Sequence, residues 1–181
     1  PGIGYADEQI ASQPVPSNAE AWFAIPRWEK IAETYGEAVK NVLALIKNQR
    51  KGKFHNWYGG QFGSRDFRQH KRTVAMGDQQ AGCDILVIPA QLGLHHRHRS
   101  VWQARQDMNA SEIDNIFEFG LGAFAVGIIL QTHPERLVSD KDLWIDCPGD
   151  ECSMLVAGQF DGAPNFGFSR GSTGFGASWV G

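Results

Sequence analysis

The chain has 181 residues, which suits one domain with a single hydrophobic core. Its hydrophobic content of 42% and aromatic content of 11% are enough for that core, and its charged content of 20% excludes a disordered chain. Three cysteines and a formal net charge of −3 point neither to a secreted disulfide scaffold nor, by themselves, to a polyanionic partner.

The charge is distributed unevenly along the chain. Residues 47–105 carry eleven basic side chains against three acidic ones, a net of +8, whereas residues 106–181 carry a net of −8 and residues 1–46 a net of −3. Either the two oppositely charged segments neutralise each other, within one chain or across a homo-oligomer, or one positive surface stays open to an anion.

The sequence predicts no membrane partner, because it lacks the run of about 18 apolar residues that a spanning helix needs. Its first residues also lack the charged and apolar regions of a signal peptide. We therefore expect a cytoplasmic, bacterial protein. The position of the true N-terminus stays open, because the sequence does not begin with Met.

The N-terminal residues predict an arm followed by one domain. Residues 1–16 contain three prolines and no hydrophobic period, which is typical of a flexible arm, and residues 17–181 then form a single domain. Ser17 and Glu20 have the spacing of a capping box, so we expect a short helix to open there.

Two longer helices are predicted next. Pro26 suits the first turn of a helix over about residues 27–49. Apolar residues recur in it at steps of three and four: Trp28, Ile31, Tyr35, Val39, Val42, Leu43 and Ile46. Ser64 is expected to cap a helix that runs to about residue 80. Its exposed face would carry four basic side chains: Arg65, Arg68, Lys71 and Arg72.

The middle of the chain predicts a strand and then a helix. Residues 83–90 (CDILVIPA) are almost continuously apolar, which favours a central strand buried on both faces. Ser100 and Gln103 form a second capping box, which opens a helix to about residue 108.

The last third predicts a buried helix and several strands. Residues 119–131 are uniformly apolar and favour a helix, with a strand as the alternative, and residues 142–147 favour a strand that ends in a type II turn at Pro148–Gly149. Alternating apolar residues over 166–179 predict a hairpin. Helices before strands indicate an α+β fold: a single domain whose small, mostly antiparallel sheet is covered by helices.

The segment LHHRHRSVWQ (94–103) is the main candidate site. Cations just before a helix repel the positive end of its dipole, but together with the free N–H groups they suit an anion. We therefore predict a soluble accessory protein that binds a phosphate- or carboxylate-bearing small molecule. The expected ligand-binding residues are the following: His95, His96, Arg97, His98, Arg99 and Ser100, with Arg65, Arg68 and Arg72 as further cations.

Two other interpretations of this segment stay open. Carboxylates from the acidic last third would relieve the same repulsion without a ligand. His96 and His98 would chelate a metal, but no third ligand is near in sequence, so no metal ligand and no cofactor is assigned. Asp146, Asp150 and Glu151 could hold a divalent cation, although acids beside a turn are usually only solvated.

Nucleic-acid binding and hydrolysis are the remaining alternatives, and whether the protein is an enzyme stays open. Residues 51–60 (KGKFHNWYGG) interleave lysines with aromatic rings, and NFGFSRG (165–171) resembles a glycine-aromatic RNA-binding strand, but neither completes a motif. A metal-assisted or His/Asp hydrolase would place a histidine of 95–98 beside a carboxylate of 146–151, with Cys147 as a nucleophile. No standard hydrolase motif accompanies them.

Three segments resemble a family of uncharacterised bacterial proteins, some of them carried on mobile gene cassettes: DILVIPAQLGLHHRHRSVWQAR (84–105), FGLGAFAVGIILQTHPERL (119–137) and DLWIDCPGDE (142–151). The resemblance covers roughly residues 22–179 and implies one intact domain. It implies no particular activity, cofactor or catalytic residue. An accessory role such as phage defence, stress response or ligand binding would fit a mobile-cassette product by analogy.

Overall fold

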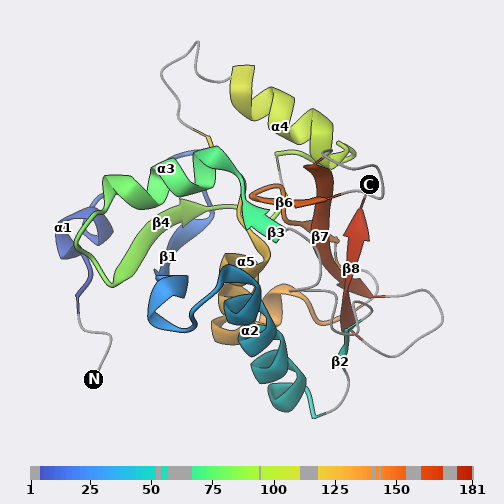
Figure 1. Cartoon of the computed structure of the whole chain (residues 1–181). Helices are drawn as coiled ribbons and strands as arrows, with labels where there is room; N and C mark the ends of the chain where they lie inside the picture. The colour runs from blue at the N-terminus through green and yellow to red at the C-terminus, as the bar shows by residue number, and fades with distance from the viewer. Residues whose placement is uncertain are drawn as a thin grey trace.

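A computed structural model describes residues 5–51, 54–56, 67–93, 95–110, 118–139, 142, 144–153, 160–168 and 175–180. These residues form one α+β domain with small, mostly antiparallel sheets, as the sequence predicted (Figure 1). None of the helices in these ranges is long and apolar enough to cross a bilayer.

The first sheet pairs the beginning of the chain with its middle. Strand β1 (Ala21–Pro26) runs antiparallel to β4 (Ile85–Ala90), with Ala21 opposite Ala90 and Pro26 opposite Ile85. Ala6 adds a parallel bridge to Ile85. The residues before β1 are therefore tied to the domain at that bridge.

The second sheet is built mainly from the last third of the chain. Its strand order is β2-β8-β7-β6-β3, with β5 paired to β7; among the described residues, the β2–β8 pair is parallel and the other pairs are antiparallel. The strands are β2 (Phe54–Asn56), β3 (Phe67–Gln69), β5 (Ile145–Asp146), β6 (Asp150–Ser153), β7 (Phe160–Phe168) and β8 (Phe175–Val180).

Two helices link the sheets. Helix α2 (Tyr35–Gln49) packs against α5 (Ala123–Thr132), α5 contacts β1, and α2 contacts β2 and β3 (Figure 1). A methyl group on Gly127 would lie 2.4 Å from Cγ1 of Val42, so this glycine permits the close helix contact. Six apolar side chains of the two helices are almost fully buried: Val39, Val42, Ile46, Val126, Ile129 and Leu130.

Arg27 joins the first sheet to a neighbouring helix. Its Nε donates to the carbonyl oxygen of Cys83, and its Nη2 donates to those of Gly77 and Gln80, at 2.6–2.7 Å. These carbonyls lie at the end of α3 (Lys71–Gln79), where a cation also offsets the negative end of the helix dipole. The other short elements are α1 (Glu8–Ala11), η1 (Trp28–Lys30), α4 (Val101–Ala110) and η3 (Pro134–Arg136).

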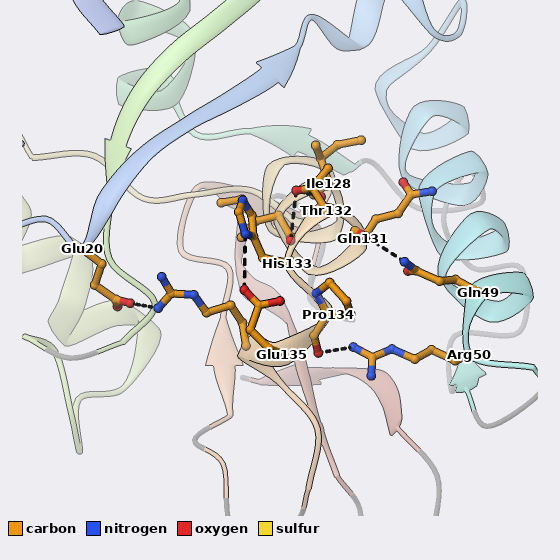
Figure 2. A network of polar contacts seen from close by, with 11 residues as sticks. Glu20, Gln49, Arg50, Ile128, Gln131, Thr132, His133, Pro134 and Glu135 are labelled. Carbon is orange, nitrogen blue, oxygen red and sulfur yellow. Dashed lines mark hydrogen bonds and ion pairs between the residues drawn. The ribbon is translucent and has the colours of Figure 1, made fainter. Parts of the chain in front are cut away.

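Polar contacts fix the C-terminal end of α5 (Figure 2). Gln49 Nε2 donates to the Gln131 carbonyl at 2.8 Å, and Arg50 Nη2 donates to the Pro134 carbonyl at 2.9 Å. Both donors stand at the end of α2, so the two helices end together. Glu20 pairs with Arg136 in the same region.

The predicted helices before residue 35 are wrong. Ser17 and Glu20 open no helix, because the Glu20 carboxylate accepts from the Leu92 N–H at 2.8 Å and pairs with Arg136 instead. The residues that follow form β1, so Pro26 ends a strand. The long helix begins at Tyr35, capped by the Thr34 hydroxyl, and the apolar period before it belongs in part to the short η1 turn.

The helix predicted from Ser64 is also wrong in its beginning. Ser64 lies outside the described residues, β3 occupies 67–69, and α3 begins after His70, whose Nδ1 accepts from Arg72 N. Arg72 is buried, with 6% of its surface exposed, because the helix turns it inward.

Two further details differ from the prediction. In the described part of the chain β4 pairs with β1 and with the single bridge at Ala6, so it is not a central strand, and Leu86 and Pro89 are partly exposed. Gly149 lacks the positive φ of a type II turn. A methyl group there would lie 2.2 Å from the Gly120 carbonyl oxygen, so close backbone contact is what requires this glycine.

The later predictions are confirmed. The Ser100–Gln103 capping box opens α4, residues 123–132 form a helix rather than a strand, and β7 and β8 form the expected antiparallel hairpin. The predicted strand at 142–147 shortens to β5.

Candidate ligand pocket

A pocket of about 370 Å³ lies beside α4. Its walls come from residues 16–19, the loop over 89–99, one face of α4, residues 118–126 and residues 144–148. Small-molecule sites usually enclose roughly 300–1,000 Å³, so this pocket suits a small ligand.

Four of the nine predicted ligand-binding residues line the pocket: His96, Arg97, His98 and Arg99. The backbone turns sharply here, since His98 adopts φ 61°, a conformation that a residue with a side chain rarely takes. Within the described part of the chain, Arg97 and His98 have no ion-pair partner. Two cationic or potentially cationic side chains are therefore available to a ligand.

The other two predicted residues in the pocket, His96 and Arg99, lie beside carboxylates of the protein. This is the arrangement expected if the protein's own acids relieve the repulsion. His96 lies between Glu118 (Nε2 to Oε2, 3.6 Å) and Asp107 (Nδ1 to Oδ2, 3.9 Å), and Arg99 Nε lies 3.2 Å from Asp107 Oδ2. Both acids belong to the acidic segment over residues 106–181. The positive cluster is thus partly neutralised from within and partly left open.

The start of α4 is closed by its own side chains. Ser100 Oγ accepts from Gln103 N at 3.2 Å, and Gln103 Oε1 accepts from Ser100 N at 2.9 Å. Neither Ser100 nor His95 lines the pocket, and both are exposed. Side chains, rather than the two capped N–H groups, are left to meet an anion.

Two of the three additional arginines lie away from the pocket lining. Arg68 pairs with Glu151 on the neighbouring strand, with Nε 2.9 Å from Oε2. The Arg72 guanidinium donates to the Glu118 carbonyl at 3.0 Å and so helps to position Glu118, which lines the pocket. Neither residue lines the pocket, and Arg65 lies outside the described residues.

The apolar residues that line the pocket were not predicted from the sequence. Val101, Ala104 and Met108 follow one another on one face of α4, a spacing that could have indicated a buried surface. Trp144 and Phe119 come from segments that are distant in sequence, and no local pattern connects them with the basic loop.

Asp146 is an acidic group of the pocket. Burial raises the pKa of its carboxyl group, and a hydrogen bond with Asn165 partly opposes that shift. The pocket therefore joins His96 and His98 to a carboxyl group of the 146–151 segment, as the hydrolase alternative requires. Cys147 is fully buried, burial raises the pKa of its thiol well above the usual value, and it does not line the pocket. It is not placed as a nucleophile.

A buried network supports the pocket from below. Asp150 is completely buried, and its carboxylate accepts from the Tyr35 hydroxyl and from Ala123 N, both at 2.6 Å. Arg105 of α4 donates to the Pro148 carbonyl at 3.1 Å and to the Asp150 carbonyl. One guanidinium thus fixes α4 to the turn between β5 and β6.

No metal site is formed by the described residues, among which no three His, Cys, Asp or Glu side chains come together to hold an ion. Asp150 and Glu151 already have the partners described above. The aromatic segments suggested for nucleic acid, residues 51–60 and 165–171, lie mostly or partly outside the described residues.

Comparisons with protein-family models, curated proteins and solved structures found no match. The resemblance to a bacterial family therefore stays a prediction, and functional inference for this chain depends on the pocket itself.

Proposed function

We propose that the protein is a cytoplasmic bacterial accessory protein that binds a small anionic ligand, carrying a phosphate or a carboxylate, in the pocket beside α4. One observation carries the proposal: Arg97 and His98 line the pocket and have no ion-pair partner among the described residues. A guanidinium group presents paired donors whose geometry matches phosphate and carboxylate oxygens.

The surroundings of the two side chains support an anion rather than a cation. Arg99 neutralises the Asp107 carboxylate, and His96 Nε2 lies 3.6 Å from Glu118 Oε2.

The test is a thermal-shift screen of sugar phosphates, nucleotides and carboxylates, followed by titration calorimetry of the best ligand. Arg97→Ala should weaken binding roughly 10- to 100-fold, the value of a charged hydrogen bond. Arg68→Ala is the matched control, because Arg68 is exposed and lies outside the pocket. Absence of any stabilising anion, or equal loss in the two variants, would refute the proposal.

A hydrolase is the second candidate, favoured by the pocket that His98 and Asp146 share. In such a hydrolase, one of the two groups takes a proton from water and the other gives a proton to the leaving group. Turnover of nitrophenyl esters or phosphates that disappears in both His98→Gln and Asp146→Asn would support it. Lack of turnover in the wild-type protein would leave ligand binding as the function.

A further inference from the structure

Trp144 stands out because a large part of its indole is exposed beside a pocket. Its surface is 47% exposed, and the ring lines the same pocket as Arg97. Exposed tryptophans at the edge of a concave site are typical of ligand contacts, since the ring provides a large flat surface and has few side-chain torsions to restrain.

Strand pairing determines where this indole lies. Ile145 pairs with Phe166 and Asp146 with Asn165, so the antiparallel register carries Trp144 to the level of Gly167. A methyl group on Gly167 would lie 2.4 Å from Cδ2 of the indole and 2.7 Å from Cε2 and Cγ. The ring therefore rests directly on the backbone of β7, and the missing side chain of Gly167 is what lets it rest there.

The rest of the pocket combines apolar surface with cations. Met108 of α4 and Leu121 add apolar atoms, and a methionine adapts well to the edge or face of a ring. Arg97 and His98 supply the polar end that the proposed function assigns to an anion. A flat apolar surface and a guanidinium group in one pocket match a ligand that has both a ring and a negative group.

From this arrangement we infer that the ligand is a ring-bearing anion: a planar aromatic or heteroaromatic ring, stacked on Trp144, with one phosphate or carboxylate group held by Arg97. This inference rests on the proposed function and narrows its ligand class. The pocket, of about 370 Å³, is near the lower limit of ligand sites, so one ring system with one anionic group suits it better than a dinucleotide does.

The experiment compares probes that differ only in the ring. Phenyl phosphate and cyclohexyl phosphate carry the same charge, as do benzoate and cyclohexanecarboxylate, but only the first of each pair is planar. Stacking of a ring on an aromatic side chain changes affinity roughly tenfold or more. By calorimetry, the wild-type protein should therefore bind the planar probe at least about tenfold more tightly than its partner.

Variants assign that preference to Trp144. Trp144→Leu should remove the planar preference while cyclohexyl phosphate still binds, and Trp144→Phe should restore part of it. Gly167→Ala keeps the indole but displaces it, so it should also lower the preference. Trp102→Leu is the control, because Trp102 is an exposed tryptophan, at 55%, that does not line the pocket.

The outcomes separate this inference from the proposed function. If planar and cyclohexyl probes bind equally well and Arg97→Ala abolishes both, the inferred stacking on Trp144 is refuted but the proposed anion site is not. A planar preference that survives Trp144→Leu would also overturn the inference. Failure of all four probes, while another anion of the thermal-shift screen binds and is lost in Arg97→Ala, would overturn the inference and leave the proposed function intact.

Discussion

The carboxyl group of Asp150 has a strongly raised pKa. Asp150 belongs to β6, and its completely buried side chain lies at the first turn of α5. Burial raises the pKa of its carboxyl group from 3.8 to about 7, although the hydrogen bonds from Tyr35 and Ala123 act to lower it. A folded protein that holds the proton more tightly than the unfolded chain is stabilised at low pH. This stabilisation is complete below about pH 4 and is lost as the pH rises through about 7.

Asp150→Asn should therefore change how stability depends on pH. The amide keeps the shape of the carboxyl group, still accepts from Ala123 N and does not titrate. Between about pH 4 and pH 8 the wild-type protein should lose roughly 2–4 kcal/mol of unfolding free energy relative to the variant. Urea unfolding of both proteins at several pH values measures the difference; parallel pH profiles would contradict this role.

Residues that act within one turn of chain could be predicted from the sequence, and residues that act across the fold could not. The capping box of Ser100 and Gln103 requires only their spacing, so it was predicted with its function. Trp144 comes to line the same pocket as the basic loop only because β5 pairs with β7, and no pattern near Trp144 in the sequence predicts that pairing.

At the scale of elements, Arg105 holds α4 in place. Arg105→Ala should lower the free energy of unfolding by about 2–4 kcal/mol, because it leaves buried carbonyl groups without their donor. Ligand affinity should fall as well, since one face of α4 lines the pocket. Denaturant unfolding and titration check the two effects. Gln106→Ala, an exposed neighbour on the same helix, should change neither; equal behaviour of the two variants would count against the anchor.

Glu20 connects three segments through one carboxylate. Glu20→Ala removes both the bond to Leu92 N and the pair with Arg136, and should cost about 1–3 kcal/mol of unfolding free energy. The exposed Glu29→Ala is the control and should stay within about 0.5 kcal/mol of the wild-type protein. A Glu20 variant as stable as this control would show that these two contacts of Glu20 do not stabilise the fold.

The elements that were predicted wrongly are those whose conformation depends on distant partners. β1 exists because β4 pairs with it from 59 to 69 residues away, and Glu20 acts on Leu92 and Arg136 rather than on its own turn. In contrast, α4 and the β7–β8 hairpin depend on neighbours in sequence, so capping and alternation were enough to predict them.

At the scale of the molecule, the basic and acidic segments contact each other. Arg68 pairs with Glu151, Arg99 with Asp107, and Arg105 reaches the backbone of Asp150. The α+β class could be predicted from the order of helical and strand-like segments. The contacts between the basic and acidic segments could not, because the composition of a segment gives its charge but not where each charged side chain lies in the fold.

Raising the salt concentration should distinguish charge that stabilises the fold through ion pairs from charge that binds an anion. The pairs at Arg68 and Arg99 are exposed, so raising NaCl from about 0.05 M to about 0.5 M should lower the free energy of unfolding by less than about 1 kcal/mol. Binding of an anionic probe should weaken more steeply than stability falls, because the same salt competes for Arg97. Unfolding or dissociation at high salt would instead favour mutual neutralisation of the segments as their main role.

Anomalous diffraction from crystals soaked in 4-iodobenzoate most directly tests whether the pocket beside α4 holds a ring-bearing anion. The iodine marks one end of the ring, and the electron density shows where the carboxylate lies. We predict a single strong iodine peak inside the pocket, with the ring against Trp144 and the carboxylate within hydrogen-bonding distance of Arg97. A pocket that stays empty while iodine binds elsewhere on the surface would contradict the proposed site.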